Sequence, residues 1–393
     1  MKYTIHKVNG YTVILVPNDT NTVHINACIK TGSMNETKHD AGLHHLIEHI
    51  LTETWKPCGK QTCNSYWDKK GVTMNAHTHL SYMNFYVNGL VEDMDEMMNY
   101  MVDIITKPFF KNSTFEIEKH AVLNELLIQI NNPENKLHDA FNKAFFIDVY
   151  SSDYSLQIKN LKHMNMKKIQ DFYEKINKEI IFVISGPKKM PNFKENYKQK
   201  KSIPFVFTNH SKIIYVPYKQ KSTVLMMGLP VVTPCLFKFK ACLQILHMIL
   251  FQKLRIEMKL IYSISVYLET LPAPHIIIKS TIETKHVPIV YKTIIDTFHK
   301  YKTEPFPQEY IDGMKKRNEL TYHNTNLNSM FMANYILKEY LNGEIFSLET
   351  KLKEINKMKA KDFMKIMVVL DNCLVAYQGP EKVLVNLHHL QHH

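Results

Sequence analysis

The stretch YTVILVPN at residues 11–18 has a counterpart 200 residues later, SKIIYVPY at residues 211–218. Both are short apolar runs that end in Val-Pro, as expected of β-strands. Two more pairs follow in the same order: LKHMNMKKIQDF (161–172) with LKEINKMKAKDF (352–363), and IIFVISGP (180–187) with CLVAYQGP (373–380). We interpret the chain as one ancestral domain that was duplicated. Chance similarity between short apolar runs is the alternative.

Each half begins with strands, continues with helices and ends with a strand, an order that predicts an α+β fold. We therefore expect two homologous α/β sandwich domains, each a mainly antiparallel sheet with helices packed on it. In the first half we predict strands over 2–7, 11–17, 22–30, 72–88 and 180–185, and helices over 40–54, 92–106, 114–131, 134–148 and 166–176. The expected domains are 1–190 and 206–393, joined by a polar linker over 191–205.

The composition is that of a globular protein, with 45% hydrophobic and 22% charged residues among 393. No apolar run approaches the roughly 20 residues of a membrane span. The N-terminus has neither the apolar stretch of a signal peptide nor the arginines of a mitochondrial presequence. The formal net charge is +12, but the lysines are spread along the chain, so we expect no binding to nucleic acid.

The six cysteines are irregularly spaced, at positions 28, 58, 63, 235, 242 and 373. We read them as free thiols in the cytoplasm or another reducing intracellular compartment. A local pair or a metal clip formed by Cys58 and Cys63 is the alternative. The frequent use of Lys, Asn and Ile is typical of an AT-rich genome and is compatible with a virus or a protist.

The predicted helix over 40–54 contains DAGLHHLIEHIL at residues 40–51, with Asp40 placed to act as its N-cap. His45 and His49 are four residues apart, so both can bind one metal ion from the same face of the helix. Glu48 lies close to that face and can contact a metal-bound water. We expect His44 to be a bystander. The alternative is an amphipathic helix whose histidines are satisfied within the core.

A catalytic zinc site needs a third protein ligand. FEIEKHAVLNELLIQI at residues 115–130 is a periodic helix in which Glu118 and Glu125 share one face. Carboxylates are rarely buried on such a face without a partner, and a cation between two helices would supply one. A solvated acidic stripe is the alternative.

Together these motifs resemble the inverzincin zinc metallopeptidases, the family of pitrilysin, insulin-degrading enzyme and mitochondrial processing peptidase, here of a two-domain, short-chain type. The resemblance rests on His45-x-x-Glu48-His49 after Gly42-Leu43, on Glu125 76 residues later, on Asn75-Ala76-x-Thr78, and on LRIEMKLIYSIS (254–265) with Arg255 and Tyr262. It extends over nearly the whole chain.

The resemblance implies one zinc ion per chain, bound by His45, His49 and Glu125. Glu48 would be the general base that takes a proton from water. Glu118 would be a supporting carboxylate, either orienting a histidine ligand or carrying charge near the metal.

It also implies that the strand around 74–80 is an exposed edge, where Asn75, Ala76 and Thr78 bind a substrate peptide by β-augmentation. His77 and His79 depart from the family pattern, and we expect them to be surface polar residues.

Arg255 and Tyr262 would stabilise the oxyanion or grip the substrate backbone. A surface salt bridge is the alternative for Arg255, one of two arginines in the chain. Lys259 stands where relatives commonly have glycine, which puts the geometry of this loop in question.

The implied function is that of a zinc-dependent endopeptidase that cleaves unfolded peptides or protein segments inside an enclosed chamber. The second half lacks the triad, so we expect a homodimer in which Arg255 and Tyr262 act on the partner's zinc site. A catalytically idle structural or assembly subunit is one alternative. A metal-binding protein that uses histidines such as those of the tail LHHLQHH (387–393) is another.

Overall fold

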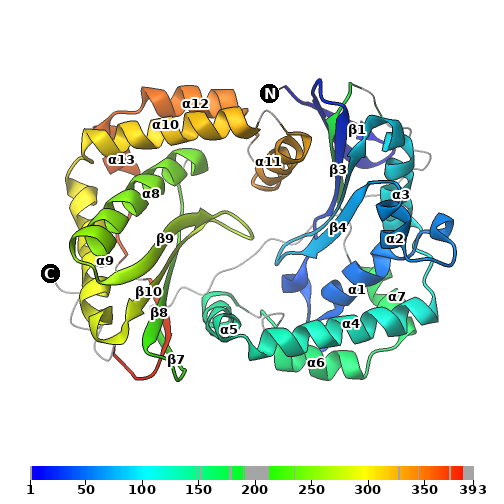
Figure 1. Ribbon diagram of the computed structural model, residues 1–393, viewed down its shortest axis with the longest axis horizontal. Helices are drawn as coiled ribbons and strands as arrows, with labels where there is room; N and C mark the ends of the chain where they lie inside the picture. The colour runs from blue at the N-terminus through cyan, green and yellow to red at the C-terminus, as the bar shows by residue number, and fades with distance from the viewer. Residues whose placement is uncertain are drawn as a thin grey trace. The chain divides into compact units, whose positions relative to one another are not determined.

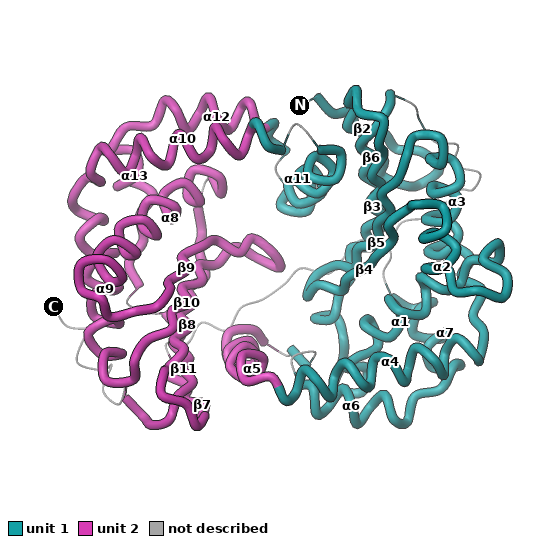
Figure 2. The backbone as a smooth tube through the Cα atoms, in the orientation of Figure 1, with its two compact units in different colours: residues 1–131, 148–204, 323–347 teal, residues 132–147, 205–322, 348–393 magenta. Residues whose placement is uncertain are grey.

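The structure of the protein is a computed structural model that divides into two compact units (Figures 1 and 2). Unit 1 comprises residues 1–131, 148–204 and 323–347, and unit 2 comprises residues 132–147, 205–322 and 348–393. The structure describes residues 2–147, 149–150, 153–176, 179–188, 190, 212–233, 235–325, 328–343, 345–370 and 373–383. The predicted linker over 191–205 and the tail over 387–393 lie outside them.

The core of unit 1 is a six-stranded sheet with the order β1-β2-β6-β3-β5-β4. Its strands are β1 (Thr4–Val8), β2 (Tyr11–Pro17), β3 (Thr22–Ile29), β4 (Thr73–Thr78), β5 (Met83–Leu90) and β6 (Ile180–Gly186). Neighbouring strands are antiparallel except β2 and β6, which are parallel. As a result, β4 is an edge strand.

The sheet of unit 2 repeats this topology with the order β7-β11-β8-β10-β9. Its strands are β7 (Ile213–Pro217), β8 (Ser222–Pro230), β9 (Ile261–Glu269), β10 (His275–Glu283) and β11 (Leu374–Gly379). Its parallel pair, β7 and β11, corresponds to β2 and β6 of unit 1, and its other pairs are antiparallel. Strand order and strand sense therefore match in the two units, which confirms the predicted α+β fold built from a duplicated half.

Helices cover both faces of each sheet. In unit 1, α1 and α3 pack on one face, over a core that contains Val23, Ile25 and Leu46. The helices of unit 1 are α1 (Leu43–Thr52), α2 (Cys63–Asp68), α3 (Met94–Thr106), α4 (Asn112–Asn131), α6 (Tyr154–Lys162), α7 (Met166–Lys175) and α11 (Ser329–Leu341). Those of unit 2 are α5 (Pro133–Phe145), α8 (Leu236–Phe251), α9 (Val287–Thr303), α10 (Gln308–Thr325, of which the last three residues fall in unit 1), α12 (Leu348–Lys357) and α13 (Ala360–Ile366).

The two halves exchange one helix each, as the colours of Figure 2 show for α5 and α11. Helix α11, from the second half, packs on β3 and β6 through Met332, Ile336 and Leu337. Helix α5, from the first half, packs on β7 and β11. These helices begin 196 residues apart, at 133 and 329, so they are corresponding elements of the repeat. Neither sheet is covered by its own half alone.

Two details of the first half differ from the prediction. The predicted strand over 72–88 is a hairpin, β4 and β5, because the chain turns at 79–82. The backbone amides of Ser33 and Met34 bind the carbonyls of His79 and Leu80 in that turn, at 3.2 and 2.9 Å. The short helices α2 and α6 were not predicted, since neither offers a long apolar period.

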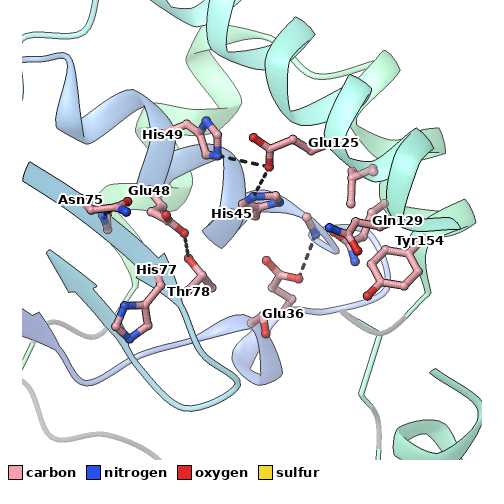
Figure 3. A pocket seen from close by; sticks show the side chains of 15 residues that line it. Glu36, His45, Glu48, His49, Asn75, His77, Thr78, Glu125, Gln129 and Tyr154 are labelled. Carbon is pink, nitrogen blue, oxygen red and sulfur yellow. Dashed lines mark hydrogen bonds and ion pairs between the residues drawn. The ribbon is translucent and has the colours of Figure 1, made fainter. Parts of the chain in front are cut away.

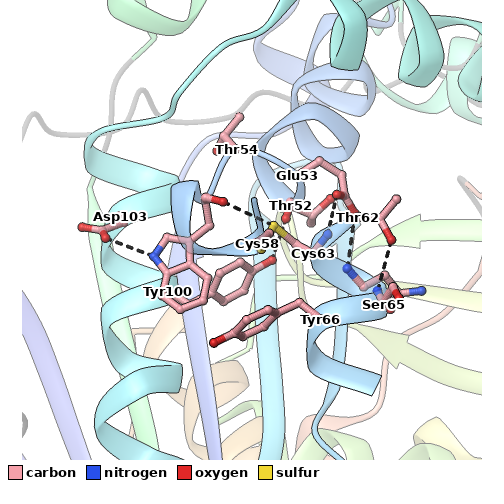
Figure 4. The surroundings of a disulfide bond; sticks show 12 residues. Thr52, Glu53, Thr54, Cys58, Thr62, Cys63, Ser65, Tyr66, Tyr100 and Asp103 are labelled. Carbon is pink, nitrogen blue, oxygen red and sulfur yellow. Dashed lines mark hydrogen bonds between the residues drawn. A yellow bond between two sulfur atoms is a disulfide. The ribbon is translucent and has the colours of Figure 1, made fainter. Parts of the chain in front are cut away.

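Cys58 and Cys63 form a disulfide between the turn that follows α1 and the start of α2 (Figure 4). The expectation of free thiols was therefore wrong at these two positions, and the local pair is correct. The turn at Lys56–Cys58 brings the two Cα atoms to 5.2 Å, within the range that a disulfide requires. Cys28, Cys235, Cys242 and Cys373 are not part of a disulfide. No helix in the described residues is both long and apolar enough to cross a membrane.

Protonation of His24 should destabilise the fold. This side chain is fully buried on the face of β3 that α11 covers, and burial lowers its pKa to about 4. The nearby side-chain amides of Asn26 and Asn334 raise the pKa and offset only part of this effect. The unfolded chain binds this proton below about pH 6.5, so stability is lost as pH falls from 6.5 toward 4. At about 1.4 kcal/mol per pKa unit, the loss is roughly 3 kcal/mol.

We predict that the free energy of unfolding falls less between pH 7 and pH 4.5 in His24→Leu than in wild type, and that the two falls differ by roughly 2–3 kcal/mol. Urea unfolding at both pH values measures this difference. The exposed His39, changed to Leu, is the matched control. The same pH dependence in His24→Leu and wild type would contradict the prediction.

Candidate active site

Helix α1, which carries the three histidines, is anchored at its N-terminus by a buried carboxylate from outside the helix. Gly42 is the N-cap, with φ of 97° in the left-handed region that glycine adopts without strain. The carboxylate of Glu36 accepts hydrogen bonds from the amides of Gly42 and His44, at 2.9 and 2.7 Å. The prediction that Asp40 is the N-cap was wrong, because its carboxylate accepts from the hydroxyl of Thr37 instead.

His44 is part of this anchor and points away from the metal-binding face. Its ring is fully buried, with Nδ1 3.1 Å from Glu36 Oε1 and Nε2 3.2 Å from the hydroxyl of Thr31. Both ring nitrogens therefore have partners within the core. A buried carboxylate is stable only when it is hydrogen-bonded or paired, and His44 with the helix amides meets that need.

His45, His49 and Glu125 converge on one point at the surface of unit 1 (Figure 3). Their ligand atoms all lie within 4.8 Å of one another. Oε2 of Glu125 is 3.4 Å from Nε2 of His45 and 3.7 Å from Nε2 of His49. The histidines come from successive turns of α1 and the glutamate from α4, which packs beside it.

These three groups fit a zinc ion. Zinc binds imidazole nitrogen and carboxylate oxygen at about 2.0–2.2 Å in a tetrahedron, so its ligand atoms lie about 3.4 Å apart. The distance between Nε2 of His45 and Oε2 of Glu125 has this value. Glu125 is 49% exposed, which leaves the solvent side of the cluster open for a fourth ligand. Two nitrogens and one oxygen with an open position are the donor set of a catalytic zinc site.

Glu118 supports the cluster through His49. Its Oε2 lies 3.2 Å from Nδ1 of His49, so that nitrogen donates to it and Nε2 keeps its lone pair for a metal. In the metal-free protein, burial lowers the pKa of His49. The hydrogen bond to Glu118 and the charges of Glu125 and Glu48 outweigh burial and raise that pKa above its usual value. Glu118 therefore stabilises His49 in either of two states, with a proton on Nε2 or with a metal ion bound there.

Glu48 is buried beside the cluster, with 8% of its surface exposed. Its Oε2 accepts a hydrogen bond of 2.6 Å from the hydroxyl of Thr78, on β4. Figure 3 shows Glu48 between this hydroxyl and the two histidines. Thr78, expected among the substrate-binding residues, thus fixes the orientation of the Glu48 carboxylate.

The edge strand β4 forms one wall of a cavity of about 570 Å³ at the cluster. Along β4, Asn75 and His77 are exposed, whereas Ala76 and Thr78 are half-buried against the α1 side. Asn75 accepts a hydrogen bond from the amide of Ala76. His77 contacts the rings of Tyr82 and Tyr86, with centroids 5.7 and 6.5 Å apart.

The opposite wall of the cavity contains residues that the sequence did not single out: Ser33, Glu36, Gln129, Tyr154 and Gln157. Tyr154 and Gln157 belong to α6, which lies beside α4. Because α6 was not predicted, no pattern in the sequence pointed to this wall. The periodicity of α4 places Gln129 one turn after Glu125, so that residue could have been found.

Arg255 and Tyr262 lie together in unit 2. Arg255 is in a π-helical turn, Gln252–Glu257, and its guanidinium donates to the carbonyl of Ile261 at 3.1 Å. The same guanidinium lies 5.4 Å from the ring centre of Tyr262, which is 76% exposed on the edge strand β9. Among the described residues, no carboxylate forms an ion pair with Arg255.

Lys259, which stands where relatives commonly have glycine, keeps the backbone conformation that glycine adopts. It has φ of 55°, in the left-handed region that favours glycine. The loop therefore keeps the conformation that glycine suits, and lysine adopts it at a small cost in strain.

Two family profiles match the chain and together span most of it. Residues 12–152 match the insulinase profile of peptidase family M16, and residues 163–318 match the M16 inactive-domain profile. The chain belongs to peptidase family M16. The first match contains the His45, His49 and Glu125 cluster, and the second contains Arg255 and Tyr262.

Several relatives of this M16 chain are named as zinc proteases. It is 31% identical over 144 residues to the uncharacterized zinc protease YmxG of Bacillus subtilis, covering 35% of this chain and 34% of the relative. It is 24% identical over 189 residues to the mitochondrial-processing peptidase subunit beta of Saccharomyces cerevisiae, covering 45% and 39%. The chain thus spans about a third to two fifths of the length of these relatives.

Solved structures share the fold along the whole M16 chain. A protease from Helicobacter pylori superposes with a TM-score of 0.81 at 15% identity, covering 96% of this chain and 99% of that one. A peptidase M16 inactive domain from Pseudomonas fluorescens superposes with a TM-score of 0.78 at 14% identity, covering 98% and 99%. At this identity the likeness concerns the fold alone.

We predict that Glu118→Gln weakens zinc binding at pH 8 by roughly 10–100-fold, since the partner that orients His49 is lost. The variant also lowers the pKa of His49, because the hydrogen bond and the charge of Glu118 both raise it. Protons then compete with zinc only at lower pH, so the fall in affinity upon acidification shifts to lower pH. Chelator competition at pH 6, 7 and 8 measures both effects. Equal affinities at pH 8 would contradict the prediction.

Proposed function

We propose that this protein is a zinc-dependent endopeptidase that hydrolyses peptide bonds in extended, unfolded segments. The observation that carries the proposal is the convergence of His45, His49 and Glu125 beside Glu48 and the edge strand β4. The names of its zinc-protease relatives support the same reaction class.

The side chains divide the work of hydrolysis. A zinc ion held by His45, His49 and Glu125 would supply Lewis acidity, which polarises the scissile carbonyl and acidifies water. Glu48 accepts the proton of the attacking water and passes it to the leaving nitrogen as the C–N bond breaks. The hydrogen bond from Thr78 holds the Glu48 carboxylate in place for both transfers.

The substrate backbone would pair with β4. Within the described part of the chain, that strand has one neighbour in the sheet, β5, so its outer edge offers amides and carbonyls to an extended peptide. The 570 Å³ cavity beside Asn75, Ala76 and Thr78 then accommodates side chains of the bound segment. Because β-augmentation requires an extended chain, folded proteins are excluded as substrates.

We further propose a homodimer in which Arg255 and Tyr262 act on the partner's zinc site inside an enclosed chamber. Two features of unit 2 support this role. Tyr262 is exposed on the edge strand β9 and Arg255 is exposed in the turn before it, and no carboxylate among the described residues pairs with the guanidinium. A cation and a phenol donor can stabilise the oxyanion of the reaction or bind the substrate backbone.

The alternative is a catalytically idle assembly subunit of the same fold. The inactive-domain profile matches residues 163–318, where α8 has Leu243, Leu246 and His247 at the positions that correspond to His45, Glu48 and His49. That match thus concerns the second half. The first half has retained both histidines and both carboxylates, which favours the active enzyme.

Glu48→Gln tests the reaction directly. We predict that it keeps zinc, because Glu48 is not a ligand, and lowers the rate of peptide cleavage roughly 10²–10⁴-fold, as loss of a general base does. Mass spectrometry of a digested peptide pool measures cleavage, and elemental analysis measures zinc. Glu116→Gln, on an exposed residue of α4, is the matched control. Zinc-loaded wild type that cleaves no peptide would refute the proposal.

Mixing protomers tests the dimer. Glu48→Gln and Arg255→Ala protomers should each be inactive alone, whereas an equal mixture should recover about a quarter of wild-type activity. The recovery arises because half of the dimers are heterodimers, each with one intact zinc site served by one intact Arg255. Native mass spectrometry shows whether heterodimers form. Heterodimers without activity would count against action in trans.

A further inference from the structure

A second, smaller pocket of about 300 Å³ adjoins the cluster. Its lining residues are Glu48, His49, Thr52, Glu53, Asn64, Met74, Asn75 and Ala76. Four of these, Glu48, His49, Asn75 and Ala76, also line the larger cavity. The smaller pocket reaches Met74 and the larger one reaches Thr78, so the two lie toward opposite ends of β4. A peptide laid along this strand would place the residues on the two sides of its scissile bond in different pockets.

Glu53 gives the smaller pocket a carboxylate that is held in place. One of its oxygens accepts the amide of Cys63 at 2.6 Å, and the other accepts the amide of Asn64 at 3.4 Å (Figure 4). The disulfide of Cys63 to Cys58 fixes the segment that supplies these amides. A carboxylate oxygen has two lone pairs, so each oxygen keeps one acceptor site for a ligand.

The electrostatics of the pocket favour a cation. Glu53 is the C-cap of α1, where the helix dipole places partial negative charge. Burial raises the pKa of Glu53, and the like charge of nearby Glu118 adds to that rise. A positive side chain would relieve this repulsion. The lining contains no lysine or arginine, although the chain as a whole carries a formal charge of +12.

The remaining wall suits the hydrocarbon part of a long side chain. Met74 and Ala76 project from β4 on the α1 side and contribute apolar surface to the core there. Lysine and arginine bury their methylene stems against such surface while the charged group reaches a polar partner. Thr52 and Asn64 add neutral hydrogen-bonding groups near the carboxylate.

We propose that the pocket around Glu53 is a specificity subsite for a lysine or arginine side chain next to the scissile bond. This inference rests on the proposed peptidase activity and names a feature of its substrates. The stem lies on Met74 and Ala76, and the ammonium or guanidinium group binds the carboxylate of Glu53. Glu53 thus selects the substrate, while Glu48 serves the reaction.

Peptide-pool digestion by the zinc-loaded full chain tests the subsite. Mass spectrometry locates the scissile bonds, and lysine or arginine should be enriched at one fixed position on one side of them. Matched peptides that carry lysine or norleucine at that position then give a ratio of kcat/KM values. We expect a ratio of roughly ten for wild type, the value of one charge-assisted hydrogen bond. Glu53→Gln should bring it to about 1–2, whereas Glu116→Gln should leave it unchanged.

The outcomes separate this inference from the peptidase proposal. If wild type cleaves peptides without a preference for lysine or arginine, the subsite is refuted and the peptidase proposal stands. An unchanged ratio in Glu53→Gln, with a melting temperature like that of wild type, also refutes it. If zinc-loaded wild type cleaves nothing, the peptidase proposal fails and the subsite falls with it. A lower melting temperature of Glu53→Gln leaves the test valid, because the ratio compares two substrates of the same folded enzyme.

Discussion

The site depends on the buried carboxylate of Glu36. It binds two amides at the start of α1 and the ring of His44, so it fixes where this helix begins. Just before Glu36, Ser33 and Met34 bind the turn of the β4–β5 hairpin. One short segment thereby sets α1 and β4 relative to each other. Without the amides and His44, the desolvation of the Glu36 carboxylate would cost several kcal/mol, so helix and carboxylate require each other.

Once α1 is placed, the rest of the cluster follows from helix geometry. His45 and His49 face the same side because they are four residues apart. Glu118 and Glu125 are two turns apart on α4, so one reaches Nδ1 of His49 while the other reaches both Nε2 atoms. One helix therefore supplies both Glu125, the proposed third metal ligand, and Glu118, whose carboxylate lies against the ring of His49. In the duplicated unit, α8 has Leu243 and Leu246 where α1 has His45 and Glu48, so this unit shares the fold but not the cluster.

Much of this could be predicted from the sequence because the relevant patterns are local. The spacing within DAGLHHLIEHIL and within 115–130 is read along single helices, and the repeats revealed the duplication. Interactions between distant segments could not be predicted. The capping of α1 by Glu36, the turn that splits 72–88 into two strands and the bond from Thr78 to Glu48 all join separate elements. The exchange of α5 and α11 is invisible in periodicity, because it concerns which sheet a helix packs on.

The central claim is that His45, His49 and Glu125 bind one zinc ion. Anomalous diffraction at the zinc edge from crystals of the zinc-loaded protein tests it most directly. The account predicts one strong peak per chain, within about 2.0–2.2 Å of Nε2 of His45, Nε2 of His49 and a carboxylate oxygen of Glu125. A peak at other residues, or no peak at this cluster in zinc-replete crystals, would contradict it.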